Sequence, residues 1–168
     1  PVRPSSRVLR VIQDRIEQKT FLQTHGLAVP AFYGISLPED LSRQTVLQYP
    51  LICKTSTAGY DGKGQWRIGR AEDCAAVQRD LTRAMKPGLR WILEEYLSFE
   101  REVSILVVRG ADGAMRTYPV VENIHEDGIL RQTTVPADVP ATIAEQAAMM
   151  ARGAVQALEG VGVFCVEL

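Results

Sequence analysis

The sequence has no marked excess of charge of either sign. Its 168 residues include 19 lysines and arginines and 20 aspartates and glutamates, which give a formal net charge of −1. Proteins that bind nucleic acids without sequence preference neutralise phosphates with an excess of basic residues, so the charge balance argues against that class. Any anionic ligand must therefore be bound by a local group of cations.

Cysteine is scarce. The three residues Cys53, Cys74 and Cys165 are odd in number and show no CxxC spacing. A disulfide framework or a zinc site needs a larger and more regularly spaced set. We therefore expect three packing residues in a reducing compartment.

Long hydrophobic runs are absent. No apolar run reaches the roughly 18 residues of a membrane span, and the first fifteen residues lack the apolar segment of a secretory signal. We expect a cytoplasmic protein with no membrane partner. The chain starts at Pro1 rather than at a methionine and stops at Leu168 directly after an apolar segment, so we also expect a piece of a longer protein.

Helical and strand-like patterns are both present. Apolar residues recur at helical spacing in the ranges 5–25, 71–85 and 140–158. Strand-like segments occupy the ranges 27–35, 45–56, 64–69, 90–97, 101–110, 114–123 and 161–168, the last of which is typical of a buried strand. Asp112-Gly113 predicts a hairpin between two of these strands. The order predicts an α+β fold with two antiparallel sheets, the first with a short helix and the second with a long one.

A glycine-rich loop follows the segment YPLICKTST. Residues 58–65, AGYDGKGQ, contain three glycines and a lysine. Glycine lets backbone N–H groups approach a ligand closely, and a lysine adds a charge suited to phosphate, so the segment indicates a phosphate-binding loop. Asp-Gly is also a strong turn signal, so a simple hairpin turn explains the segment equally well. One loop can be both.

Five segments carry a family resemblance. They are QDRIEQK, YPLICKTSTAGYDGKGQW, ILEEYLSFEREVS, YPVVENIHEDGIL and VGVFCVEL. In this order they resemble the central ATP-grasp region of the N5-carboxyaminoimidazole ribonucleotide synthetases, from about residue 2 to residue 168. The Walker pattern GxxxxGK[ST] does not occur, which argues against a P-loop enzyme.

The resemblance implies a domain organisation and an activity. Residues 1–30 are expected to form a helical linker, 31–97 the small ATP-grasp subdomain with the glycine loop, and 98–168 the first part of the large subdomain. The implied activity is ATP-dependent carboxylation of 5-aminoimidazole ribonucleotide with bicarbonate, through carboxyphosphate, in purine biosynthesis. The implied cofactors are ATP and Mg²⁺, which Mn²⁺ can replace. The family is typically homodimeric and has no nucleic-acid partner.

The resemblance also implies roles for individual residues. Arg15 and Lys54 bind the triphosphate, and the loop from Gly59 to Gln65 covers it. Tyr60, Asp61 and Lys63 form the implied catalytic set. The nucleotide-binding residues that the resemblance implies are Arg15, Lys54, Gly59, Tyr60, Asp61, Gly62, Lys63, Gly64, Gln65, Glu94, Glu95, Tyr96, Leu97, Glu102 and His125. Of these, residues 94–97 hold adenine through main-chain groups, and Glu102 binds the ribose.

Glu167 is the implied first ligand of Mg²⁺, and a second carboxylate is expected beyond Leu168. A carboxylate in a buried strand is costly unless it is paired or bound to metal, which favours this role. Other positions have simpler explanations. Glu94, Glu95 and Glu100 fit a solvated strand end. His125 fits a turn residue in NIHEDG equally well.

Two rival functions remain open. The first is another ATP-grasp ligase of purine synthesis, such as the formate-using transformylase. The second is a non-catalytic nucleotide-binding module. The glycine loop with its tyrosine favours the carboxylase.

Overall fold

The computed structural model describes residues 2–57, 64–126 and 128–168. These residues form two compact units, which are described separately. Unit 1 comprises residues 1–12, 21–28 and 99–168, and unit 2 comprises residues 13–20 and 29–98. Residues 1–30, expected to be a helical linker, are thus divided between the two units. None of the helices in the described residues has the length and apolar character needed to cross a membrane.

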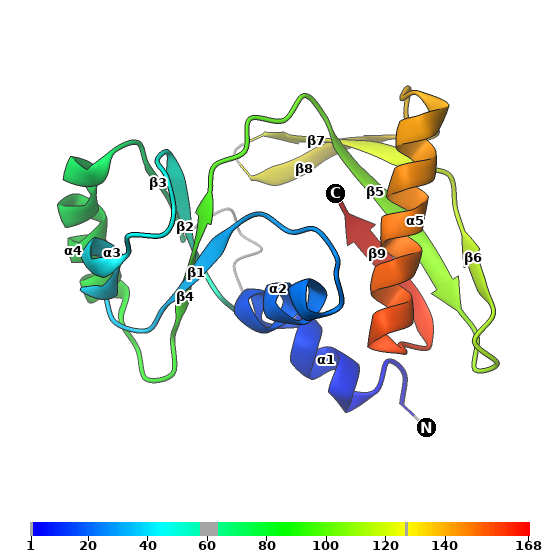
Figure 1. The fold of residues 1–168 in the computed structure, drawn as a ribbon, viewed down its shortest axis with the longest axis horizontal. Helices are drawn as coiled ribbons and strands as arrows, with labels where there is room; N and C mark the ends of the chain where they lie inside the picture. Colours follow the sequence, from blue (N-terminus) through cyan, green and yellow to red (C-terminus); the bar gives the residue numbers. More distant parts are fainter. Residues whose placement is uncertain (1, 58–63, 127) are drawn as a thin grey trace. The chain divides into compact units, whose positions relative to one another are not determined.

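Unit 2 is built on a four-stranded antiparallel sheet. Its strands, in the order β1-β4-β2-β3, are β1 (Phe32–Ile35), β4 (Trp91–Glu95), β2 (Leu51–Thr55) and β3 (Gln65–Ile68). A 3-10 helix (Ala71–Asp73) leads into α4 (Cys74–Ala84), and the short α3 (Asp40–Arg43) lies beside α4 (Figure 1). Successive strand residues point to opposite faces of a sheet, so each strand can contribute to the core and to a second surface.

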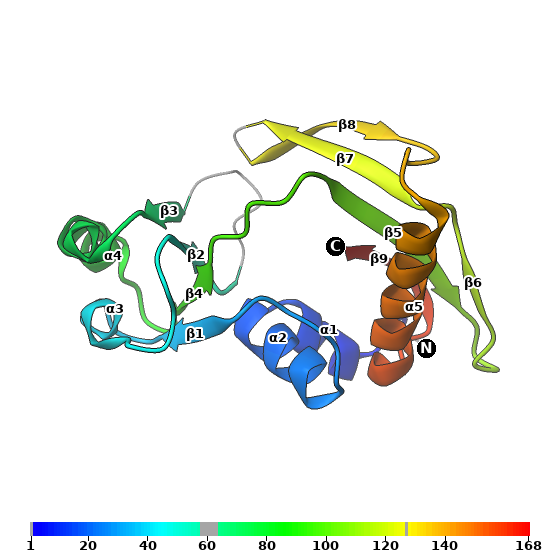
Figure 2. The same ribbon diagram turned by 45° about the horizontal axis from the view of Figure 1, so that its top comes forward.

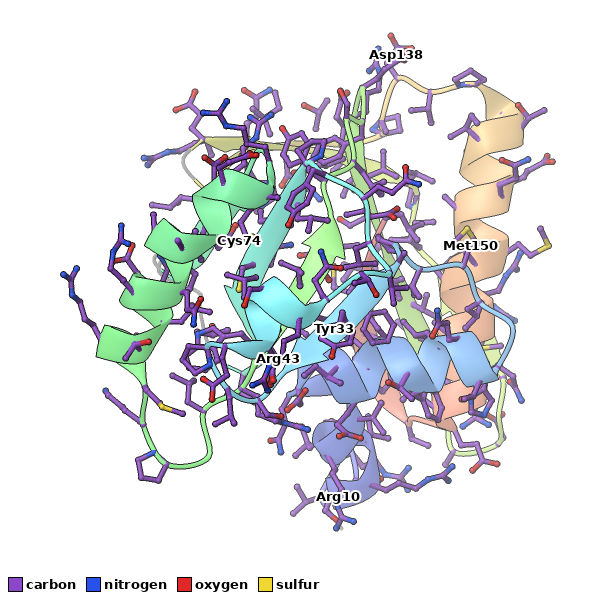
Figure 3. All side chains as sticks on the ribbon, turned by 60° about the vertical axis from the view of Figure 1, so that its left-hand side comes forward. Arg10, Tyr33, Arg43, Cys74, Asp138 and Met150 are labelled. Atoms are coloured by element: carbon purple, nitrogen blue, oxygen red, sulfur yellow. The ribbon has the colours of Figure 1, made fainter. Side chains whose placement is uncertain are left out.

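One face of this sheet forms the core of unit 2. Leu51 and Cys53 of β2 and Leu93 of β4 are fully buried there, together with Leu81 of α4. Figure 3 shows Cys74 on α4 and Tyr33 on β1, and both side chains belong to this packing. The opposite face carries Ile52 and Lys54, because these residues alternate with the buried ones. This second face receives the first turns of α2 (Arg15–Thr24), where the side chain of Ile16 approaches Gly34.

Unit 1 contains α1 (Ser6–Ile12), a five-stranded antiparallel sheet and α5 (Ala141–Leu158). The strands are β5 (Glu102–Arg109), β6 (Met115–Thr117), β7 (Val121–Glu126), β8 (Ile129–Thr134) and β9 (Gly162–Glu167). Helix α5 lies against one face of this sheet in both ribbon views (Figures 1 and 2). The core under it includes Ile105, Val107, Ala151, Val155 and Phe164.

The expected α+β fold with two antiparallel sheets is confirmed. The helical pattern of residues 5–25 forms α1 and α2, and Gly26 follows with a φ of +73°. The hairpin expected at Asp112-Gly113 joins β5 to β6, with Gly113 at a φ of +82°. Left-handed backbone of this kind favours glycine, which explains why glycine occupies both positions.

Three expectations about unit 1 are wrong. The segment 114–123 forms two strands, β6 and β7, rather than one, and β8 was not expected at all. Strand β9 is not buried on both faces. Phe164 and Val166 pack toward α5, whereas Val163, Cys165 and Glu167 are exposed on the other face. Cys165 is therefore not a packing residue, unlike Cys53 and Cys74.

Candidate functional site

The N-terminus of α2 is fixed to the end of β2, directly before the glycine loop. The Arg15 N–H donates a hydrogen bond to the Ser56 carbonyl at 2.8 Å, and Asp14 bridges to Thr57. The Ser56 N–H in turn donates to the Arg90 carbonyl at 2.9 Å. These bonds hold the start of α2 against the end of β2, at the point of unit 2 from which the chain continues into the glycine loop.

Asp14 holds this junction together, although it was not among the site residues expected from the sequence. Its Oδ1 accepts hydrogen bonds from the N–H groups of Ile16 (2.9 Å) and Glu17 (3.3 Å), which caps α2. Its Oδ2 lies 2.8 Å from Arg90 Nη2 and accepts a bond from the Ser56 hydroxyl at 3.3 Å. Burial raises the pKa of the Asp14 carboxyl, but Arg90 and the two N–H groups lower it by more. The carboxyl therefore stays ionised.

We predict that Asp14→Asn lowers the free energy of unfolding by about 2 kcal/mol at pH 7, since it weakens a cap and a half-buried ion pair. The native pKa lies below the unfolded value, so this stabilisation is present above about pH 4 and is lost as the pH falls through the native pKa. Urea unfolding at pH 7 and at pH 3 measures both effects. Asp80→Asn is the control, because Asp80 is half exposed and pairs only with Arg83 among the described ion pairs.

Two cations lie at this junction. The Arg15 guanidinium donates to the Thr55 carbonyl at 3.1 Å and is partly buried. Lys54, the preceding residue of β2, has its Nζ 2.8 Å from Glu94 Oε2. Arg15 begins α2 and reaches the end of β2 through Thr55, whereas Lys54 belongs to β2 itself, a few residues before the glycine loop. An anion site in a nearly neutral protein would need such a local pair of cations.

Glu94 is a buried carboxylate that faces two lysines. Its second oxygen, Oε1, lies 2.9 Å from the Nζ of Lys19, which comes from α2. Burial raises the pKa of Glu94, but the ammonium groups of Lys54 and Lys19 lower it by more, so the pKa lies below its usual range. Only 5% of Glu94 is exposed, so its interpretation as a solvated strand end is wrong. Glu100 is exposed and fits that interpretation, and Glu95 is half-buried.

The residues expected to hold adenine, 94–97, lie at the end of β4 and directly after it. Glu95 and Tyr96 donate their N–H groups to the carbonyls of Ala31 (3.2 Å) and Pro50 (2.9 Å). These two N–H groups are therefore engaged within unit 2 and are not available to a ligand. The Tyr96 ring stacks under the Arg67 guanidinium at 4.3 Å from its centroid, and Leu97 is half exposed.

The glycine loop itself falls largely outside the described residues, which exclude Gly59, Tyr60, Asp61, Gly62 and Lys63. Its last two positions are described. Gly64 has a φ of +81°, and its carbonyl accepts a bond from the Thr55 N–H at 3.3 Å. Gln65 begins β3 opposite Lys54. The loop thus joins the antiparallel strands β2 and β3, which fits both a phosphate-binding loop and a simple hairpin turn.

Unit 1 carries Glu102 and His125, which the structure brings together. The His125 Nδ1 contacts Glu102 Oε2 across β5 and β7. His125 is a residue of β7, so its interpretation as a turn residue is wrong. On the same sheet face, the Asn123 amide donates to the Ser104 hydroxyl at 2.8 Å and accepts from Thr133 at 3.0 Å. This face is the one opposite α5, because Val103 and Ile105 alternate with these residues and pack in the core.

Glu167 lies in β9 opposite Ser104 of β5, so it shares this polar face with Glu102. It is exposed rather than buried, so the argument that burial requires a cation does not hold for it. A carboxylate oxygen still suits Mg²⁺. Among the described residues, however, no group of three carboxylate, histidine or cysteine side chains could hold a metal ion.

The chain is similar to known proteins over nearly its whole length. A family model described as the ATP-grasp domain matches residues 20–168. The chain is 34% identical to an N5-carboxyaminoimidazole ribonucleotide synthase of Vibrio vulnificus, over 98% of its own length and 44% of the relative's. It therefore spans less than half of that relative.

Two solved structures are similar over nearly the whole chain. One is an N5-carboxyaminoimidazole ribonucleotide synthetase in complex with ADP, with 34% identity, a TM-score of 0.88 and coverage of 97% of this chain and 42% of that one. The other is an Aspergillus clavatus N5-carboxyaminoimidazole synthase in complex with ADP and 5-aminoimidazole ribonucleotide. It has 30% identity, a TM-score of 0.84 and coverage of 98% and 42%.

Proposed function

The chain belongs to the ATP-grasp family, and on this premise we propose that the full-length protein is an N5-carboxyaminoimidazole ribonucleotide synthase. It uses ATP to convert bicarbonate into carboxyphosphate with release of ADP. The exocyclic amine of 5-aminoimidazole ribonucleotide then attacks the carboxyl carbon, which gives N5-carboxyaminoimidazole ribonucleotide and phosphate. The names of the relatives support this reaction, which extends beyond the part of the protein that the chain spans.

The observation that carries the proposal is the pair of cations at the end of β2, the strand that leads into the glycine loop. Arg15 and Lys54 reach this point from different elements, and both are held by named partners. Phosphoryl transfer depends on neutralising charge on the phosphates rather than on covalent chemistry by the protein. A fixed cation pair beside a loop rich in glycine meets that requirement.

The remaining roles in unit 2 are proposals of the same kind. We assign Gly59 through Gln65 to the phosphates, with Tyr60, Asp61 and Lys63 nearest the transferring group. Residues 94–97 form the adenine slot. The apolar surface of Tyr96 and Leu97 supports this assignment, since adenine sites combine an apolar slot with a few polar groups.

In unit 1 we assign Glu102 to the ribose and His125 to its neighbourhood, because these two side chains already form a pair. Glu167 would supply one carboxylate to Mg²⁺, and the ion would neutralise charge on the phosphates. The described residues contain no complete metal site, so in this proposal Glu167 is one ligand of a set that they do not complete. Residues 31–97 and 98–168 correspond in our proposal to the small and large subdomains. We also propose that the full-length protein is a homodimer in the cytoplasm.

We predict that the full-length protein releases ADP from ATP and bicarbonate at a rate that rises at least about tenfold when 5-aminoimidazole ribonucleotide is added. A coupled ADP assay measures this, and omission of bicarbonate is the control. Release that depends on formate instead would favour the transformylase. Nucleotide binding without any ADP release would favour a non-catalytic module.

A further inference from the structure

Lys19 was not among the site residues expected from the sequence, although it belongs to the segment QDRIEQK that contains Arg15. It lies one turn along α2 from Arg15, and its Nζ contacts Glu94 Oε1 at 2.9 Å. Only 16% of its side chain is exposed. A lysine held this far from water needs a partner, and Glu94 is that partner.

Glu94 is shared between two cations that differ in exposure. The Lys54 side chain is 28% exposed, whereas that of Lys19 is 16% exposed. Lys54 and Glu94 share one face of the sheet, because Glu94 lies opposite Ile52 and Lys54 is two residues farther along β2. Lys54 is thus the more accessible cation of the three-residue cluster Lys19–Glu94–Lys54, and it is the one next to the phosphate loop.

The cluster has an uncompensated positive charge. Two ammonium groups and one carboxylate sum to +1, since Glu94 is ionised. If Glu94 faced Lys54 alone, the pair would be neutral and would attract a phosphate weakly. With Lys19 on its other oxygen, the carboxylate is already neutralised, so the charge of Lys54 stays available to an anion.

We propose that Lys19 is a positioning residue of the nucleotide site: it neutralises Glu94 and thereby leaves the charge of Lys54 available to the phosphates. The inference rests on the proposed function, because it requires a nucleotide at this junction. Lys19 itself does not touch the nucleotide. Its effect reaches only the phosphates, and adenosine, which lacks them, does not sense it.

Calorimetric titration of the full-length protein with ADP and with adenosine tests this proposal. Lys19→Met is expected to weaken ADP binding about tenfold, or about 1.4 kcal/mol, and to leave adenosine binding unchanged. Lys19→Arg restores the cation and is expected to bind ADP almost as well as the wild type. Lys86→Met is the control, since Lys86 is an exposed lysine of the same unit outside the cluster.

The double variant Lys19→Met/Glu94→Gln separates charge from structure. It removes the carboxylate that would otherwise cancel Lys54 and keeps the main chain of residue 94, so ADP affinity is expected to recover most of the loss. The double variant also has no buried carboxylate that lacks a cation, so its ADP affinity can be measured even if Lys19→Met fails to fold. Equal loss of ADP and adenosine binding, or no recovery in the double variant, would overturn the role of Lys19. Absence of ADP binding by the wild type would instead overturn the proposed function and this inference with it.

Discussion

Glu167→Gln in the full-length protein is expected to lower kcat at least about 100-fold, the scale on which one electrostatic contact to the transition state acts. The reason is the loss of a charged ligand of Mg²⁺, since a neutral amide oxygen binds a hard cation less well than a carboxylate does. Glu167 is exposed in β9, so the substitution should leave the free energy of unfolding nearly unchanged.

The dependence on metal concentration tests this interpretation. The variant should need a higher Mg²⁺ concentration for half-maximal activity, because only the metal site is altered. Glu145→Gln is the control, since Glu145 is an exposed carboxylate of α5 and therefore lies on the other side of the sheet. Normal turnover in Glu167→Gln would show that the metal is bound elsewhere.

Local signals in the sequence predicted most of the fold. Short strand-like segments predicted β2 and β4, and Asp112-Gly113 marked a hairpin where the backbone of Gly113 is left-handed. The exposure of β9 was not predictable in this way. An uninterrupted apolar run is typical of a strand buried on both faces, yet β9 packs against α5 on one face only in the described part of the chain.

The charged contacts of the site could not be predicted, because their members are distant in sequence. Asp14 and Arg90 are 76 residues apart. The three residues of the Lys19–Glu94–Lys54 cluster come from α2, β4 and β2, and no spacing rule connects them. The sequence identified Lys54 as a phosphate cation from the loop that follows it. It did not indicate that Glu94, expected to act through its main chain, would hold that cation with its side chain.

Lys54→Met is expected to raise the Kd for ATP about 100-fold, or about 2.7 kcal/mol. The substitution removes the accessible ammonium of the cluster and keeps a side chain of similar length, which can still lie along the sheet. Truncation of one partner of a close charge pair has effects of this size. The loss should be larger than that for Lys19→Met, because Lys54 contacts the phosphates directly in our proposal.

The fold should tolerate this change, because Glu94 keeps Lys19 as a partner 2.9 Å away. A buried carboxylate with no partner would be strongly destabilising, whereas one with a remaining ion pair and hydrogen bond should cost about 1 kcal/mol. Calorimetry with ATP and urea unfolding of the same preparation measure the two quantities, with Lys86→Met as the control for a lost surface lysine. A folded Lys54→Met variant that binds ATP as tightly as the wild type would remove Lys54 from the phosphate site. A variant that fails to fold would mean that Lys19 alone cannot stabilise Glu94, and would contradict the division of charge within the cluster.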